Sequence, residues 1–323
     1  MSNDNFKEFT AKKEITLTFQ NQPEVKEFFE NWSRMVPTLF LLDICVVGVT
    51  KLDRNALDSS NRKAKYIDLL KTYDEPHYCF SFLPALMEQV SDSRGLKPAE
   101  EIKKQLLEDI NSLRSFFKNA RVYETDEFIL NFADELMGKH IEKNRENFLK
   151  FLSLMNDVYK LHNTISLSKR IEKAREIIKE AIKLNISPQH PLVIIILACL
   201  YGNKSAKKIL KFKDDPKKFQ AENALADIML IQRFAKIKLE MEYLEAKENK
   251  GFPNVKFLTD DIGLSELFKH FKPILVQIKD HESGSETFFK FTINMKELLI
   301  DIKDEENEII KLLSVNEKII NGA

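Results

Sequence analysis

A nearly continuous apolar stretch, interrupted by one acid, constrains the fold of this chain more than any other feature. The stretch from Thr38 to Val49 is rich in branched apolar residues, and Asp43 is its single charged residue. Such runs are typical of central strands in parallel sheets, where both faces are buried. We therefore predict a buried strand here. An unpaired carboxylate in this setting is strongly disfavoured, so Asp43 needs a hydrogen-bonding partner or a cation.

Strand and helix patterns alternate along much of the remaining chain. HYCFSFLPALMEQV indicates a strand that leads through Pro84 into a helix. A long helical pattern from Lys217 to about Ala246 precedes a strand (Val255 to Leu258), a helix (Gly263 to Phe271) and another strand (Ile274 to Ile278). This alternation predicts an α/β fold with a mainly parallel sheet and helices on both faces.

Further acids follow these predicted elements. Glu88 lies on the helix after the second strand, Asp227 lies one turn after Asn223 on one side of the long helix, and Asp260 and Asp261 follow the strand VKFLT. Each acid also has an ordinary interpretation: Glu88 as a solvated helix residue, and one of the Asp260–Asp261 pair as a helix N-cap. Gathered at one sheet edge, however, these carboxylates would suit a magnesium or manganese ion.

The settings of these acids resemble those of the PIN domain, a fold of metal-dependent ribonucleases. The resemblance rests on LFLLDICVV, FLPALMEQV, NALADIMLI and FLTDDIGL, and it covers residues 36–93 and 186–278 as a discontinuous catalytic domain. It implies a PIN-like parallel sheet, a site formed by Asp43, Glu88, Asp227 and Asp261, and bound Mg or Mn. The family's Thr-x-Asp spacing, read from Thr259, favours Asp261 as a metal ligand and leaves Asp260 as the alternative.

Two segments lie outside this resemblance. Residues 95–185 have helical spacing throughout, which predicts a large helical insertion. Residues 279–323 predict a small C-terminal extension formed by a strand and a helix.

Substrate contacts are expected from local basic and polar residues, because Lys plus Arg equals Asp plus Glu, 50 against 50, and gives no global positive field. Lysines cluster just before the helix that carries Asp227, and a solvated helix face is an equally valid interpretation. The predicted substrate-binding residues are Thr259, Asn223, Lys204, Lys207 and Lys208. Glycine motifs of dinucleotide-binding folds and P-loop NTPases are absent from the sequence.

These observations leave three hypotheses. The first is a PIN-type endoribonuclease, such as a toxin or defence effector; the second is a structure-specific DNA nuclease using the same acids; the third is a catalytically silent PIN-like binding module. The resemblance favours RNA over DNA. A regulatory protein partner and a homo-oligomer are left open.

The expected location is cytoplasmic, without membrane insertion. The chain begins with a polar segment, and the longest apolar run, Leu192 to Tyr201, is shorter than the roughly 20 residues that span a bilayer. Cys45, Cys79 and Cys199 lie in apolar surroundings without a metal-binding spacing, so reduced thiols are expected.

Overall fold

A computed structural model describes residues 27, 31–53, 55–56, 60–91, 97–281 and 284–314. The chain divides into two compact units, Met1–Val36 and Pro37–Ala323. In the first unit, residues 31–35 are helical, and Trp32 and Met35 are largely exposed. All elements considered below belong to the second unit.

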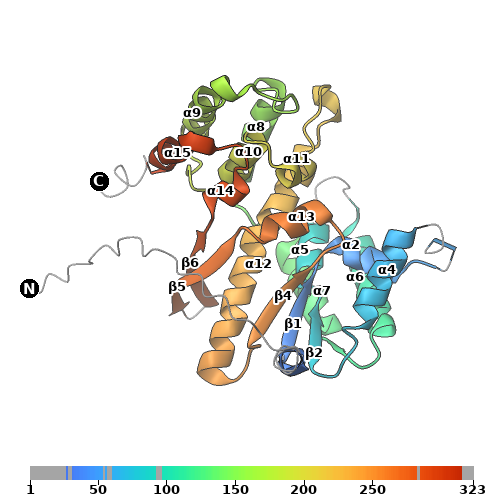
Figure 1. Ribbon diagram of the computed structural model, residues 1–323. Coiled ribbons are helices and arrows are strands. Elements are labelled where there is room, and N and C mark those ends of the chain that lie inside the picture. Colours follow the sequence, from blue (N-terminus) through green and yellow to red (C-terminus); the bar gives the residue numbers. More distant parts are fainter. Residues whose placement is uncertain are drawn as a thin grey trace, which may run out of the picture. The chain divides into compact units, whose positions relative to one another are not determined.

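A four-stranded parallel sheet lies at the centre of one part of this unit (Figure 1). Its strands are β1 (Thr38–Leu42), β2 (Tyr78–Ser81), β3 (Arg121–Val122) and β4 (Asn254–Leu258), in the spatial order β3-β2-β1-β4. Every pairing is parallel, and β1 is buried along its whole length. The predicted α/β class with a parallel sheet flanked by helices is therefore confirmed.

The first strand is shorter than the apolar stretch predicted. β1 ends at Leu42, and the residues after Asp43 form the short helix α2 (Ile44–Thr50). The carbonyl of Asp43 accepts a hydrogen bond from the N–H of Val46, which begins the helical turn. The reason for the difference is that a buried helix and a buried strand are equally apolar, so a short apolar run does not distinguish them.

The alternation of side chains along β1 separates two packed faces. Phe40 and Leu42 belong to a cluster that includes residues from α2, α4 (Asn61–Lys71), α5 (Leu83–Ser91), α6 (Ala99–Phe116) and α7 (Asp126–Leu136). Leu39 and Leu41 point to the opposite face, as expected for a strand with period two, where they pack against the long helix α12 (Ala221–Glu248).

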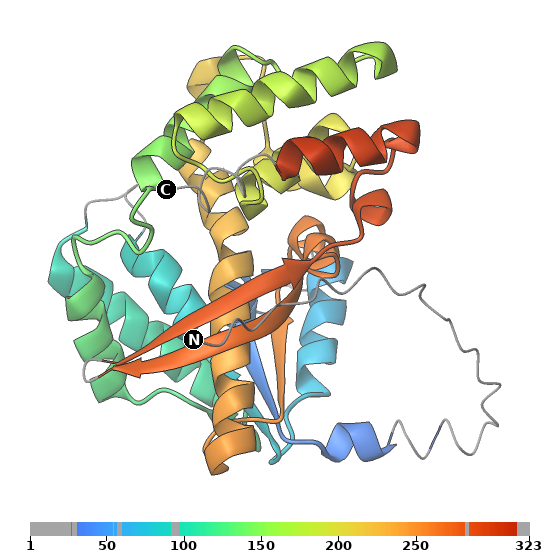
Figure 2. The ribbon, with the colours of Figure 1, turned by 90° about the vertical axis from the view of Figure 1, so that its left-hand side faces the viewer.

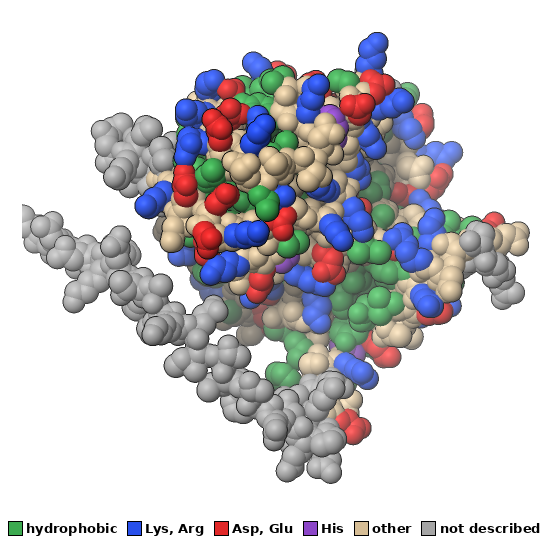
Figure 3. All heavy atoms as spheres, turned by 45° about the horizontal axis from the view of Figure 1, so that its top comes forward, with side chains coloured by type: hydrophobic (Ala, Val, Ile, Leu, Met, Phe, Trp, Pro, Cys, Tyr) green, Lys and Arg blue, Asp and Glu red, His purple; other side chains and the backbone are tan. Residues whose placement is uncertain are grey.

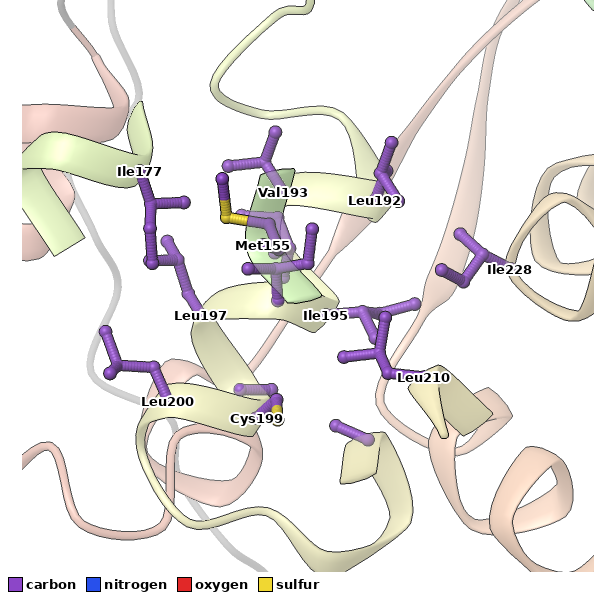
Figure 4. Close-up of a cluster of buried hydrophobic side chains, with 14 of the residues drawn as sticks. Met155, Ile177, Leu192, Val193, Ile195, Leu197, Cys199, Leu200, Leu210 and Ile228 are labelled. Carbon is purple, nitrogen blue, oxygen red and sulfur yellow. The ribbon is translucent and has the colours of Figure 1, made fainter. Parts of the chain in front are cut away.

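A second hydrophobic cluster is built almost wholly from helices. It joins α12 to α8 (Arg145–Asp157), α9 (Leu167–Lys183), α10 (Pro191–Leu200), α11 (Lys204–Leu210), α13 (Ile262–Phe268), α14 (Met295–Leu298) and α15 (Glu306–Leu313). All ten residues of α10 are buried, which explains its uniformly apolar sequence. Figure 4 shows side chains of α8 to α12 converging around it. Figure 2 shows α12 running from the sheet into this helical layer.

The predicted helical insertion, residues 95–185, is divided between the two clusters. Its first part, α6 and α7, packs against the sheet and contributes β3 as an edge strand. Its second part, α8 and α9, packs with the later helices of the chain. The structure therefore differs from a separate insertion, because helical periodicity indicates which face is buried but not what buries it.

The predicted strand after α13 is present, but it does not join the parallel sheet. β5 (Lys272–His281) pairs antiparallel with β6 (Gly284–Thr292) in a separate two-stranded sheet. Two 3₁₀ turns, Pro216–Lys218 and Lys303–Glu305, complete the described elements. No helix within the described ranges combines the length and apolarity needed to cross a bilayer.

Candidate functional site

The sheet has a switch point between β1 and β4. From β1 the chain adds β2 and β3 on one side, and β4 then joins the other side, with Leu42 beside Leu258 at the carboxyl ends. Ligands of open α/β sheets bind at such positions, because the loops after neighbouring strands diverge there. Asp43 follows β1, and Thr259, Asp260 and Asp261 follow β4. The sequence thus places four polar residues at this point.

Asp43 obtains the partners that its burial requires. Its Oδ2 accepts hydrogen bonds from the Thr259 hydroxyl at 2.5 Å and from the Cys45 thiol at 3.1 Å, and its backbone N–H donates to the Leu258 carbonyl. Its Oδ1 accepts none within the part of the chain that the structure describes. Thr259, predicted to contact substrate, instead joins β4 to Asp43 directly. One oxygen of Asp43 therefore keeps lone pairs for a further ligand.

The side chains of Asp260 and Asp261 contact different helices. Asp260 forms an ion pair with Arg62 of α4, with 2.6 Å between Oδ2 and Nη2. Asp261 is the N-cap of α13, since its Oδ1 accepts from the Leu264 N–H at 3.0 Å, and its own N–H donates to the Thr259 hydroxyl. The residue that the Thr-x-Asp spacing favours as a ligand is thus also the helix cap, and its Oδ2 has no hydrogen bond within the described residues.

Asp227 of α12 completes a cluster with Asp43 and Asp261, which we call the acid cluster. Burial, the largest cause, and the negative charges of Asp43 and Asp261 together raise the pKa of Asp227 to about 6, against the opposing effect of Lys211. Asp43 and Asp261 therefore lie within electrostatic range of Asp227. Lys211 lies just after α11, and its Nζ is 3.0 Å from Asp227 Oδ2. Among the described residues, Lys211 is the only cation that forms an ion pair with any of these three acids, and its partner is Asp227.

The basic helix α11 lies against the start of α13. A Cβ built at Gly263 would be 3.1 Å from both Lys208 Cβ and Asp261 Oδ1, so the stem of Lys208 lies beside the acid cluster. Lys204 is exposed and Lys207 is half-buried on the same helix. α11 begins at Asn203, whose side chain accepts from the Ser205 and Ala206 N–H groups. Of the predicted substrate-binding lysines, Lys208 is thus the one whose stem lies beside Gly263, next to the Asp261 carboxylate.

Asn223 and Glu88 have other neighbours. Asn223 bonds Gln220 at the start of α12. Glu88 lines a cavity, here called the Glu88 cavity, on the other side of α12 from Asp227 by helical position. Its walls also carry the carboxylates of Glu142 and Glu222 and the guanidinium groups of Arg145 and Arg233. Arg145 pairs with Glu222 at 2.9 Å, and Arg233 Nε lies 3.0 Å from Glu142 Oε1.

Two residues near the switch point and one at the far edge of the sheet were missed in the sequence. Glu124 is buried after β3, where it accepts from the Phe82 N–H at 2.9 Å and from the Ser81 hydroxyl; burial raises its pKa. Arg62 and Tyr66 of α4 lie beside Asp260. A two-residue strand before Glu124 leaves no apolar run to detect, and only tertiary packing brings α4 to β4.

The acid cluster offers the hard oxygen ligands that Mg²⁺ and Mn²⁺ prefer. However, no three His, Cys, Asp or Glu side chains of the described residues are arranged to hold an ion directly. Mg²⁺ usually keeps several waters in proteins, so the residues fit a hydrated ion held partly through water. They do not fit a closed cage of protein ligands.

Comparisons of the chain with protein-family models, with curated proteins and with solved structures give no match.

Proposed function

We propose that the chain is a PIN-like nuclease that hydrolyses phosphodiester bonds with the help of carboxylate-bound Mg²⁺ or Mn²⁺. One observation carries this proposal: Asp43 and Asp261 lie at the switch point within electrostatic range of Asp227, and Lys211 is the single cation paired with these acids among the described residues. Each of Asp43, Asp227 and Asp261 also has one carboxylate oxygen without a hydrogen-bond partner among the described residues. Asp43 is buried and Asp227 and Asp261 are half-buried, and negative charge with free oxygens in this setting suits a divalent cation.

The protein's own residues would prepare this site. The Thr259 hydroxyl donates to the Asp43 carboxylate and accepts from the backbone N–H of Asp261, and the Leu264 N–H donates to the Asp261 carboxylate, so both carboxylates are held in place. Lys208 and Lys211 place positive charge next to the acids, where a phosphate would approach. A bound divalent ion supplies the positive charge that stabilises the developing charge on the phosphate and the leaving oxygen.

RNA is the proposed substrate. This choice rests on the resemblance to PIN-type endoribonucleases, since phosphate chemistry at such acids is common to RNA and DNA. This proposal does not include Glu88 among the metal ligands. That residue belongs to the Glu88 cavity, where arginines accompany the carboxylates, and we place the ion with Asp43, Asp227 and Asp261. A cytoplasmic location and a role as a toxin or defence effector stay predictions.

The test is incubation of purified full-length protein with end-labelled single-stranded RNA and DNA, with Mg²⁺, Mn²⁺ or EDTA. We expect RNA cleavage with either metal, none with EDTA, and none above background from Asp43→Asn. Preferred cleavage of DNA would support the DNA nuclease hypothesis. Binding without cleavage would support the silent binding module and overturn the proposed function.

A further inference from the structure

A pocket of about 350 Å³ lies on the α4 side of the switch point, away from the lysines of α11. Arg62, Lys65 and Tyr66 form one wall, and Thr259 and Asp260 contribute the loop after β4. Ser265 and Glu266 of α13 also line the pocket, and the Glu266 carboxylate is paired with Lys269. Arg62 and Lys65 are three residues apart on α4, so they lie on the same side of the helix. The ion pair with Asp260 holds Arg62 over the pocket.

The Tyr66 hydroxyl lacks a hydrogen-bond partner among the described residues. The hydroxyl oxygen is buried. Burial raises the pKa of Tyr66 most, and the nearby Cys45, Asp260 and Asp43 groups act in the same direction; Tyr66 and Asp260 line the same pocket. Leaving a buried hydroxyl unpaired costs free energy, and a protein retains such a group where a ligand or water completes it.

The rim of the pocket is apolar. Leu69 of α4 and Ile262 of α13 are 42% and 54% exposed and both line the pocket. Hydrophobic and basic side chains lie next to one another on the right-hand side of Figure 3, the side on which α4 is found in Figure 1. Two cations next to two exposed aliphatic side chains suit a ligand with both a phosphate and a base.

We infer that this pocket holds one nucleotide of a single-stranded nucleic acid, with its phosphate on Arg62, Lys65 and the Tyr66 hydroxyl and its base against Leu69 and Ile262. This inference rests on the proposed function. It extends the substrate path from the lysines of α11, across the acid cluster, to α4. Asp260 is then a positioning residue for Arg62, and Asp261 is the acid that faces the ion.

The test measures binding, so that it is separate from cleavage. Anisotropy of a short labelled single-stranded RNA is titrated with full-length protein in EDTA, and a gel confirms that the RNA stays intact. The variants are Arg62→Ala/Lys65→Ala, Tyr66→Phe and, as a matched loss of charge on the same helix, Lys71→Ala, whose side chain is 64% exposed and outside the pocket. Single-stranded DNA of the same sequence forms a second arm.

We expect the Arg62/Lys65 variant to raise the Kd at least about tenfold and to lower the slope of log Kd against log salt by about 0.7 per lost phosphate contact. Tyr66→Phe should raise the Kd about threefold to tenfold, because it removes one hydrogen bond to the phosphate. A hydroxyl without a ligand would leave the Kd unchanged. Lys71→Ala should bind like the wild type.

The outcomes separate the pocket from the proposed function. Wild-type binding with no cleavage in metal keeps the pocket and overturns the nuclease. Cleavage by a wild type whose affinity the pocket variants do not change keeps the nuclease and overturns the pocket. An equal loss in Lys71→Ala, or no binding by the wild type, also overturns the pocket. Tighter binding of DNA than of RNA would retain the pocket and correct the substrate.

Discussion

Two groups of carboxylates lie on opposite sides of α12, and they differ in how their charge is offset. In the Glu88 cavity, Arg145 and Arg233 each pair with a glutamate, so positive groups are built into the protein. In the acid cluster, Lys211 is the only cation paired with an aspartate among the described residues, and the pKa of Asp227 rises to about 6. We therefore place the proposed metal site at the group of acids whose charge the protein offsets less.

The largest effect is expected in the Glu88 cavity. Arg233→Met keeps the apolar stem but leaves Glu142, whose side chain is 9% exposed, without its partner. Breaking a buried ion pair from one side costs about 3–5 kcal/mol, and urea unfolding should show a loss of this size. Lys236→Met, at a side chain 52% exposed on the same helix, is the control and should change stability little. A loss below about 1 kcal/mol in Arg233→Met would show that this ion pair is not structural.

The next largest effect is on RNA cleavage, which should depend far more on the acid cluster than on the Glu88 cavity. Asp43→Asn keeps the shape of the side chain but removes a negative charge, so RNA cleavage should fall by about a hundredfold or more. Glu88→Gln changes charge equally in the other group and should reduce cleavage far less. The measurement is the initial rate of RNA cleavage in Mn²⁺. Equal losses of rate in the two variants would show that both groups belong to one site and that Glu88 is a metal ligand.

A third effect is a pH-dependent gain in stability. The pKa of Asp227 rises from 3.8 to about 6 on folding, so the folded state binds the proton more tightly and loses stability as the pH rises through about 4 to 6. At about pH 7 the ionised carboxylate costs up to roughly 3 kcal/mol. In EDTA, Asp227→Asn should therefore be more stable than the wild type at about pH 7, and this gain should vanish near pH 4. A variant less stable at neutral pH would show that Lys211 fully offsets the charge.

The smallest effect concerns Lys211, the only cation paired with the acid cluster in the described part of the chain. Lys211→Gln removes a competitor of the divalent ion and should tighten Mn²⁺ binding by about threefold to tenfold, the size of one exposed charge interaction. Lys204→Gln, on the exposed side of the same short segment, serves as the control. Weaker Mn²⁺ binding in Lys211→Gln, but not in Lys204→Gln, would assign Lys211 a supporting role.

Much of the local fold could be predicted from the sequence because the signals are local. The apolar run before Asp43, the strand before Thr259 and the long helix with Asp227 all depend on residues near one another in the chain. The strand at Ile274 and the strand of the C-terminal extension were both predicted, but their antiparallel pairing was not, because pairing depends on tertiary contacts. For the same reason residues 95–185 were predicted as one insertion, although α6 and α7 pack on the sheet and α8 and α9 pack elsewhere.

The candidate site shows the same limit. Asp43 and the acids after β4 were found because carboxyl ends of parallel strands meet at one edge. The roles of Asp260 and Asp261 depend on whether each side chain turns toward α4 or α13, and that is decided by Arg62 and by the capping of α13. Glu88 was expected beside Asp43 because both follow neighbouring strands, but its helix directs it into the cavity with Arg145 and Arg233.

The most direct test of the account is a calorimetric titration of Mn²⁺ into the metal-free wild type, Asp227→Asn and Glu88→Gln. Asp227 lies in the uncompensated group and Glu88 in the compensated one, so the two variants remove the same charge from different settings. We predict that the wild type and Glu88→Gln bind Mn²⁺ with similar affinity, and that Asp227→Asn binds at least about tenfold more weakly, because an amide is a poor ligand for a hard dication. Unchanged binding in Asp227→Asn, or lost binding in Glu88→Gln, would contradict the account.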